Sequence, residues 1–246
     1  MPEELVLLHG FGGTHRAFDG VIAALDPQRY RPLALDLPGH GEAVGAPRPI
    51  TFAGCVEHVL AASPERFVLC GYSLGGRVAL HVALVAPERV ARLVLVSSSP
   101  GIEDAGERAA RREADERLAR ELESIPYEQF IERWRTQPLF AEELPHAGAL
   151  AREDQRRNRP DVLAAAMRGL GTGEMQPLWP RLEELEMPLI VLAGARDRKF
   201  LELGRRMIEH ARDARLQVLD GGHGLVLENP AAVAAALCGQ PRAERR

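Results

Sequence analysis

The sequence predicts an α/β protein with a mostly parallel sheet, helices on both faces and an inserted helical cap. Short apolar runs alternate with helical patterns over residues 1–101 and again over residues 186–246. The segment between them, residues 102–185, has no convincing strand pattern, is rich in arginine and is interrupted by six prolines. We therefore expect residues 1–101 and 186–246 to form one core and residues 102–185 to cover it as a cap.

The expected strands are short runs rich in leucine and β-branched residues, each followed by a loop that contains glycine. They cover residues 4–9, 31–36, 67–70, 93–96, 188–193 and 215–219. Because strands alternate with helices, the strands should lie parallel and end at the same edge of the sheet. Groups that carry out chemistry are then expected on the loops at that edge.

The expected helices are delimited by capping residues and prolines. In the core they cover residues 14–25 and 52–62, the segment from Leu74 to Pro87, a stretch after Asp197 and a last segment from Asn229. In the cap they cover residues 103–122, 127–135, 147–158 and 160–170, the last with proline at its first position.

The turn Gly71-Tyr72-Ser73-Leu74-Gly75 joins a strand pattern directly to a helical pattern. In so sharp a reversal, side chains in place of the two glycines would collide with neighbouring backbone, and the serine hydroxyl is pushed into the open above the sheet. The same pattern also fits a glycine-rich turn whose serine takes no part in chemistry. The strand before it, the helix after it and suitable partners later in the chain favour a nucleophile.

A serine nucleophile needs a base within hydrogen-bond distance, and the base needs an acid that orients it. Of the eight histidines, His223 is favoured because it follows the last strand in a Gly-Gly-His-Gly loop. The acid is expected to be Asp197, after the preceding strand, with Asp220 and Asp36 as alternatives. His15 is left open. The remaining histidines are expected to pack in loops or to lie on helices: His9, His40, His58, His81, His146 and His210.

Negative charge that develops on an oxygen atom during the reaction needs hydrogen-bond donors already in place. Backbone N–H groups suit this role, and we expect those of Leu74 and Phe11 to form an oxyanion hole. Leu74 follows the nucleophile at a helix N-terminus, and Phe11 lies in the glycine-rich loop after the first strand. Phe11 could instead be an aromatic lid without a donor role.

The formal charge is −4, from 31 basic and 35 acidic residues that are interspersed. This composition argues against a nucleic-acid or membrane-surface partner. The first residues lack a signal-like pattern, and no apolar run is long enough to cross a membrane. Cys55, Cys70 and Cys238 lie far apart in apolar contexts, which favours free thiols in a reducing compartment. We therefore expect a cytoplasmic protein, with its oligomeric state open.

Several motifs, in their order along the chain, resemble the α/β-hydrolase superfamily. The resemblance covers nearly the whole chain and implies the α/β-hydrolase fold, with Ser73, Asp197 and His223 as a catalytic triad. The motifs are His9-Gly10-Phe11, Asp36-Leu37-Pro38-Gly39-His40-Gly41, Gly71-Tyr72-Ser73-Leu74-Gly75-Gly76, Asp197 and Gly222-His223.

Other motifs resemble one family within it, the 2-succinyl-6-hydroxy-2,4-cyclohexadiene-1-carboxylate synthases of menaquinone biosynthesis. This resemblance implies a carbon–oxygen lyase that expels pyruvate from an enolpyruvyl precursor, with no cofactor and no metal ion. The motifs are the serine turn through Arg77, Ser99-Pro100-Gly101-Ile102, Glu107-Arg108-Ala109-Ala110-Arg111-Arg112 with Asp115, Trp134-Arg135-Thr136-Gln137-Pro138-Leu139-Phe140, Gly171-Thr172-Gly173 and Asp197-Arg198-Lys199-Phe200.

The same resemblance implies a small polycarboxylate substrate, which arginine binds through a planar pair of donors. Arg77 lies four residues after Ser73 and therefore on the same helical face. Arg111 matches the family's arginine in the first cap helix.

Four further residues are expected to line the substrate pocket. The family's second cap arginine aligns with Gln155, just before Arg156 and Arg157, and we predict that Arg156 takes its role. Tyr72 and Trp134 are expected to contact the substrate, although Trp134 could instead belong to the core. Lys199 is notable because it is the only lysine among 31 basic residues.

Two other functions remain compatible with these residues. A hydrolase that cleaves an ester or a carbon–carbon bond would use the same triad, with water attacking an acyl-enzyme. A capped ligand-binding protein with a vestigial triad belongs to a different class, and the intact set of serine, aspartate and histidine argues against it. Release of pyruvate distinguishes the lyase from the hydrolase, and slow or absent turnover with tight ligand binding would favour the binding protein.

Overall fold

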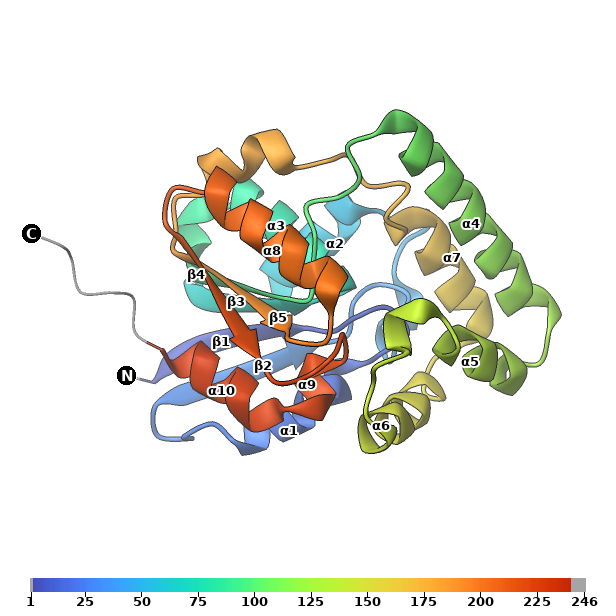
Figure 1. Cartoon of the computed structure of the whole chain (residues 1–246), viewed down its shortest axis with the longest axis horizontal. Coiled ribbons are helices and arrows are strands. Elements are labelled where there is room, and N and C mark those ends of the chain that lie inside the picture. The colour runs from blue at the N-terminus through green and yellow to red at the C-terminus, as the bar shows by residue number, and fades with distance from the viewer. Residues whose placement is uncertain (1, 240–246) are drawn as a thin grey trace, which may run out of the picture.

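The computed structural model describes residues 2–239, in which a six-stranded sheet forms the centre of the molecule (Figure 1). All five strand pairings are parallel, and the spatial order is β2-β1-β3-β4-β5-β6. The predicted α/β architecture is therefore confirmed. The strands are β1 (Glu3–Leu8), β2 (Tyr30–Leu35), β3 (Phe67–Tyr72), β4 (Val90–Val96), β5 (Leu189–Gly194) and β6 (Ala214–Leu219).

Helices cover both faces of this sheet. One face carries α2 (Phe52–Ala62), α3 (Leu74–Val85) and α8 (Arg198–His210), and the other carries α1 (Asp19–Ala23), α9 (Leu225–Glu228) and α10 (Pro230–Cys238) (Figure 1). Short 3₁₀ segments complete the core: η1 (His15–Phe18), η2 (Ala43–Gly45), η3 (Pro87–Arg89) and η5 (Trp179–Glu184). Among the described residues, no helix is both long and apolar enough to cross a membrane.

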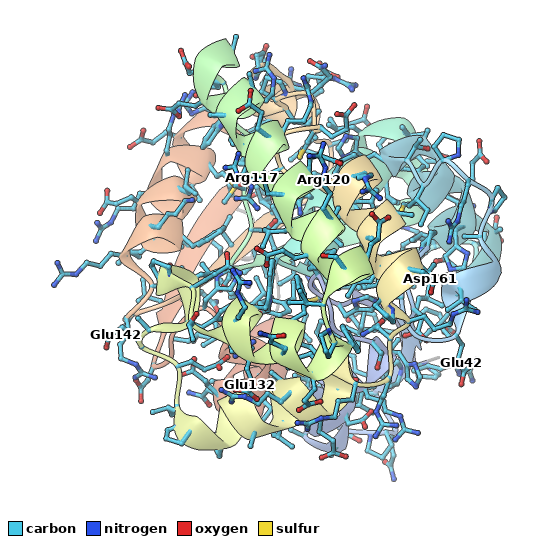
Figure 2. The ribbon with its side chains drawn as sticks, turned by 90° about the vertical axis from the view of Figure 1, so that its right-hand side faces the viewer. Glu42, Arg117, Arg120, Glu132, Glu142 and Asp161 are labelled. Atoms are coloured by element: carbon cyan, nitrogen blue, oxygen red, sulfur yellow. The ribbon has the colours of Figure 1, made fainter. Side chains whose placement is uncertain are left out.

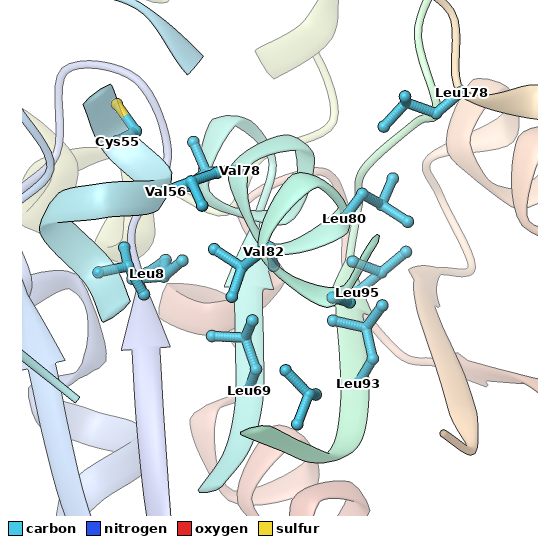
Figure 3. Packing of buried hydrophobic residues seen from close by; sticks show 14 of the residues in the cluster. Leu8, Cys55, Val56, Leu69, Val78, Leu80, Val82, Leu93, Leu95 and Leu178 are labelled. Atoms are coloured by element: carbon cyan, nitrogen blue, oxygen red, sulfur yellow. The ribbon is translucent and has the colours of Figure 1, made fainter. Parts of the chain in front are cut away.

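The two hydrophobic cores follow from the alternation of side chains along the strands. Leu69, Leu93 and Leu95 point to one face, where they pack with Val78 and Val82 of α3 (Figure 3). The intervening residues point to the other face, toward α1 and α10. The central strands β3 and β5 are buried along almost their whole length, as expected for a parallel sheet covered on both sides.

The segment between β4 and β5 forms the helical cap, which lies at one end of the sheet (Figure 1). Its helices are α4 (Ala105–Ser124), α5 (Tyr127–Arg135), α6 (Pro145–Gln155) and α7 (Pro160–Leu170), with η4 (Pro138–Phe140) between α5 and α6. A small apolar cluster around Phe130, Trp134 and Met167 holds these helices together, and Phe11 of the core packs against it. Figure 2 shows charged side chains such as Arg117 and Glu132 on the outer face of the cap.

Two helices differ most from the sequence prediction, whereas β3, β4 and α4 differ from it by two or three residues at their ends. The helix expected over residues 14–25 is the 3₁₀ segment η1 followed by the short α1, with Thr14 capping η1 through a hydrogen bond from the Arg16 N–H. The helix expected over residues 147–158 ends at Gln155. Asn158 lies beyond the helix and connects two loops of the core. Its side-chain nitrogen donates to the Gly12 carbonyl oxygen, and its side-chain oxygen accepts from the Gly41 N–H.

The topology places the loops after β1 and β3 beside each other. The chain runs from β1 to β2 on one side, then returns to build β3 to β6 on the other side. Such a reversal of strand order opens a crevice at the carboxyl ends of the two central strands, where ligands bind in sheets of this kind. Phe11 follows β1 and Ser73 follows β3, so both lie at this crevice.

The close approach of β1 to the turn after β3 can be tested with alanine. A Cβ at residue 75 would lie 2.1 Å from the Leu8 carbonyl oxygen, whereas a Cβ at residue 45 would meet nothing within 4 Å. We expect Gly75→Ala to lower the free energy of unfolding by at least ~2 kcal/mol, because buried backbone would have to move. Gly45→Ala should leave it unchanged or raise it slightly. Urea unfolding of both variants measures this, and equal stabilities would contradict the packing argument.

Candidate active site

Ser73 occupies a strained turn between β3 and α3. Its φ of 51° and ψ of −107° lie in a region that residues with a side chain rarely adopt. A Cβ at residue 71 would lie 2.3 Å from the Gly75 carbonyl oxygen, so only glycine fits there. The Ser73 N–H donates to the Val96 carbonyl oxygen at 2.9 Å, and the Ser98 hydroxyl donates to the Ser73 carbonyl oxygen at 2.8 Å. These contacts hold the turn in one conformation.

Three loops bring Ser73, His223 and Asp197 together. His223 Nε2 lies 3.2 Å from Ser73 Oγ, and His223 Nδ1 lies 2.8 Å from Asp197 Oδ2. The side chains of His223 and Asp197 are only 2% and 7% exposed. Because the carboxylate accepts the Nδ1 proton, Nε2 is left to accept the serine proton. The arrangement can therefore activate the hydroxyl of Ser73.

Neither alternative acid reaches His223. Asp220 has a side chain that is 86% exposed, and it accepts a hydrogen bond from Arg196 at 2.7 Å. Asp36 accepts hydrogen bonds from the His15 N–H at 2.6 Å and the Glu42 N–H at 2.8 Å, which keeps it in the loop after β2. The role of His15 was undecided from the sequence. In the structure its Nδ1 lies 3.0 Å from Asp36 Oδ1, so His15 helps to hold the loop after β2.

His9 and His40 pack in their loops, as predicted. His9 Nδ1 donates to the Gly10 carbonyl oxygen at 2.8 Å, and its Nε2 accepts from the Leu37 N–H at 3.0 Å. His9 therefore ties the loop after β1 to the end of β2. His40 packs against it with ring centroids 5.0 Å apart, and burial lowers the pKa of His40 to about 3. Both rings are neutral structural groups at physiological pH.

The two expected oxyanion donors lie on the loops that meet at Ser73. Leu74 is the first residue of α3, a position whose N–H has no acceptor within the helix and points along the positive end of the helix dipole. Phe11 lies in the turn after β1, closed by a hydrogen bond from the Gly13 N–H to the Gly10 carbonyl oxygen at 3.1 Å. Its ring packs 5.2 Å from that of Trp134, so the loop also supports the cap.

Two cavities under the cap meet at Ser73, Phe11, Trp134 and Leu139. The large cavity has a volume of about 640 Å³ and extends toward α3, α4 and α8. The side chamber, of about 60 Å³, extends toward α5 and α6 and contains His223. Within residues 2–239, no three His, Cys, Asp or Glu side chains lie close enough together to hold a metal ion.

Arg77 and Arg111 line the large cavity together. Arg77 is 8% exposed and donates to the Leu170 carbonyl oxygen at 2.6 Å, which anchors one nitrogen of its guanidinium. Arg111 donates through Nε to the buried Asp115 at 2.8 Å. Burial, with a smaller effect of the nearby charge of Arg111, lowers the pKa of Arg77 to about 10. The lining of the large cavity contains the cations Arg77, Arg111, Lys199 and Arg206 and the carboxylates Glu103, Asp104 and Glu107, of which Glu103 pairs with Arg206.

Trp134, Tyr72 and Lys199 also lie at these cavities. Trp134 lines both cavities and also packs in the apolar cluster of the cap. Its position therefore fits both contact with a substrate and packing in a core. Tyr72 lines the side chamber with its ring 5.6 Å from that of His223, and burial raises its pKa, which keeps the phenol protonated. Lys199 is exposed and lies at the edge of the large cavity.

The structure corrects the placement of Arg156. This residue lies outside both cavities and forms an ion pair on the surface with Glu128, where its side chain is 48% exposed. Gln155 lines the side chamber instead and is 5% exposed. Side chains of adjacent helix residues point about 100° apart. An assignment that is wrong by one residue therefore selects a side chain in solvent instead of one in the cavity. The chain therefore has a neutral amide where the family alignment had suggested a cation.

The sequence did not point to Glu228, which stabilises the loop that carries His223. Glu228 on α9 has a fully buried side chain, and its two carboxylate oxygens accept from the Gly222 N–H at 3.0 and 3.1 Å. It also accepts from Arg196 at 2.5 Å, next to Asp197. One carboxylate thus connects the loops that carry His223 and Asp197. The only available signal was an acidic residue five positions after His223, which also fits an exposed helix position.

The assignment of the acid can be tested without a substrate. We expect Asp197→Asn to slow modification of Ser73 by a fluorophosphonate by about three orders of magnitude, because the wrong tautomer of His223 would face the hydroxyl. Asp220→Asn should react at the wild-type rate. The label on Ser73 is followed by mass spectrometry, and thermal melting checks that both variants fold. A slow Asp220→Asn variant beside a fast Asp197→Asn variant would reverse the assignment.

Comparison with known proteins agrees with the fold. The model of the alpha/beta hydrolase family matches residues 5–236. The chain is 35% identical over 244 residues to the 2-succinyl-6-hydroxy-2,4-cyclohexadiene-1-carboxylate synthase of Serratia proteamaculans (strain 568), covering 95% of this chain and 91% of that protein. It is 31% identical over 238 residues to the putative synthase of the same name from Bacillus subtilis (strain 168), covering 93% and 86%. The structure of MenH from S. aureus matches with a TM-score of 0.89 at 31% identity, covering 96% and 92%. The chain therefore belongs to the α/β hydrolase family.

Proposed function

We propose that this protein is a lyase of menaquinone biosynthesis. It would convert 2-succinyl-5-enolpyruvyl-6-hydroxy-3-cyclohexene-1-carboxylate to 2-succinyl-6-hydroxy-2,4-cyclohexadiene-1-carboxylate and pyruvate. The observation that carries the proposal is the pair Arg77 and Arg111 in a large cavity that opens onto Ser73. Relatives that are 31–35% identical over almost the whole chain bear the name of this synthase, which supports the choice of substrate.

The guanidinium groups of Arg77 and Arg111 favour a substrate with several carboxylates. Arg77 lines the cavity and donates through one nitrogen to the Leu170 carbonyl oxygen, so its guanidinium has further donors for a carboxylate. Arg111 contributes Nη groups beyond the Nε that pairs with Asp115. Guanidinium groups bind carboxylates through paired, charge-assisted hydrogen bonds, which are stronger where water is excluded by a cap.

The first step is removal of the ring proton next to the succinyl ketone. His223 accepts the proton of the Ser73 hydroxyl, and Ser73 Oγ takes the proton from carbon, so that the proton gained by the pair comes from the substrate. The electrons of the broken C–H bond move toward the ketone oxygen. The N–H groups of Phe11 and Leu74 would stabilise this developing oxyanion.

The second step expels the leaving group. As the ketone re-forms, the ring double bonds shift to the conjugated diene, and the carbon–oxygen bond to the enolpyruvyl group breaks. The leaving enolate takes up a proton, which the protonated His223 can supply, and becomes pyruvate. The chain begins and ends this cycle in the same protonation state, and no acyl-enzyme forms. A hydrolase would need such an intermediate and a water molecule to cleave it.

Two further assignments belong to this proposal. The core would comprise residues 1–101 and 186–246, with residues 102–185 as the cap, although Leu178 and Trp179 at the end of that range pack in the core of the sheet. A cytoplasmic location is supported by the three cysteines, Cys55, Cys70 and Cys238, which are all free thiols in the structure.

Loss of either member of the serine–histidine pair should abolish most of the reaction. We expect Ser73→Ala and His223→Ala each to lower kcat for pyruvate release by at least about three orders of magnitude, because the two residues act as one unit. The double variant should be no more than about tenfold slower than the slower single variant. Pyruvate is measured through coupling to lactate dehydrogenase. Wild-type protein that hydrolyses esters but releases no pyruvate would replace the lyase with the hydrolase alternative.

The two arginines should matter most for anionic substrates. We expect Arg77→Ala and Arg111→Ala each to lower kcat/KM for the enolpyruvyl precursor by about ten to a few hundredfold, since each loses one or two charge-assisted hydrogen bonds. Replacement by lysine should restore only part of this, because lysine lacks the planar pair of donors.

The same arginine variants are then tested on the neutral ester p-nitrophenyl acetate. Their loss of kcat/KM for this ester should be at least tenfold smaller than their loss for the enolpyruvyl precursor. Arg117→Ala is the matched control, because Arg117 lies on the same helix as Arg111 but on its exposed outer face (Figure 2). Equal losses on the anionic and the neutral substrate would mean that the two arginines support the fold or the triad, and would remove the argument for a polycarboxylate.

A further inference from the structure

The side chamber contains two buried polar side chains with unfilled hydrogen-bonding capacity. Arg135, at the end of α5, has a side chain that is 6% exposed, and Gln155, at the end of α6, is 5% exposed. Among the described residues, Arg135 Nε and Gln155 Oε1 have no hydrogen-bond partner. Both residues line the chamber beside Ser73. Unfilled buried polar groups lower stability, so two of them around one small space indicate a site that a ligand completes.

The guanidinium of Arg135 is held between an aromatic ring and a carboxylate. It lies over the ring of Phe140, 3.9 Å from the centroid, and donates through Nη2 to Glu143. Glu143 has a side chain that is 8% exposed and lines the same chamber. Burial lowers the pKa of Arg135 to about 10, so this side chain stays protonated at neutral pH.

We propose that Arg135 is a further carboxylate-binding residue of the active site, and that Glu143 holds its place until a carboxylate arm of the substrate displaces it. The proposal rests on the proposed function, because it assigns one carboxylate of that substrate to the side chamber. Arg77 and Arg111 lie in the large cavity, which meets the side chamber at Ser73. A substrate with carboxylates on two arms would be held across the nucleophile.

Displacement of Glu143 leaves no buried charge unpaired. One carboxylate replaces another at the same guanidinium, so the costly state in which a buried cation has no partner is avoided. Glu143 also has a second cation nearby. Glu143 Oε2 and Arg152 Nη1 both lie beside Gly148, at 3.0 and 3.2 Å from the position that a Cβ would occupy there. Arg152 is 34% exposed and already pairs with Glu132 at 3.1 Å, so a displaced Glu143 would share this cation near solvent.

A purely structural ion pair makes the opposite prediction. If Glu143 only supports Arg135, its removal leaves the guanidinium poorly placed and weakens any ligand in the chamber. If Glu143 competes with the ligand, its removal strengthens carboxylate binding. The sign of the effect therefore separates the two roles.

The experiment measures dissociation constants of succinate and of its neutral analogue succinamide, by NMR titration of the full chain. Glu143→Gln is expected to tighten succinate binding about tenfold and to change succinamide binding less than twofold. The double variant Arg135→Ala/Glu143→Gln should not show this tighter binding of succinate. Glu128→Gln is the matched control, because it removes the carboxylate of the exposed Arg156–Glu128 pair in the same cap, and should leave both constants unchanged.

Unchanged or weaker succinate binding by folded Glu143→Gln overturns the proposal. A gain that persists in the double variant overturns it as well, because the carboxylate would then bind elsewhere. If Glu143→Gln does not fold, Glu143→Asp provides the same comparison, since the shorter side chain withdraws its carboxylate from Arg135 and should also tighten succinate binding.

The result is independent of the proposed reaction. A protein that shows the gain in succinate binding but releases no pyruvate from the enolpyruvyl precursor would retain the assignment of Arg135 and overturn the lyase. A protein that releases pyruvate without the gain would retain the lyase and overturn the assignment.

Discussion

The reversal of the chain at Ser73 leaves no space for side chains at Gly71 and Gly75, and the geometry of the site depends on this constraint. The positive φ of Ser73 directs its hydroxyl to the carboxyl edge of the sheet. The same turn starts α3, so the Leu74 N–H and the Arg77 side chain follow at defined distances along one helix. A candidate nucleophile, a candidate oxyanion donor and a candidate carboxylate-binding group are thus positioned by one local feature.

The remaining members of the site are positioned by the order of the strands. Asp197 and His223 follow β5 and β6, which are neighbours in the sheet, and this brings the carboxylate to the imidazole. The buried carboxylate of Glu228 then connects the two loops through Gly222 and Arg196. Because Glu228 lies on α9, the short helix after His223, the packing of that helix on the sheet also determines where the imidazole lies.

The arginines in the cap and directly beneath it lie in two different environments. Most of them pair with glutamates on its outer surface, as Arg168 does with Glu116 and Glu123, and such exposed pairs contribute little to stability. Arg77 of the core and Arg135 of the cap are instead buried next to cavities that reach Ser73. Removal from water makes each of these charges expensive unless it is paired.

The sequence by itself determined the α/β class, the six strands and the residues of the serine, histidine and aspartate arrangement. These features follow from local patterns: apolar periodicity, glycines around a sharp turn, and loops that follow strands. Helix α5 and helix α7 begin and end at the predicted residues for the same reason.

Only the tertiary structure decided which charged residues of the cap face inward. Arg156 and Gln155 are adjacent in the sequence, yet one lies in solvent and the other in the side chamber, because α6 ends with that side against the core. Arg135, Glu143 and Glu228 look like ordinary charged helix or loop residues in the sequence. Their burial results from the packing of segments far apart in the chain, and no local pattern encodes it.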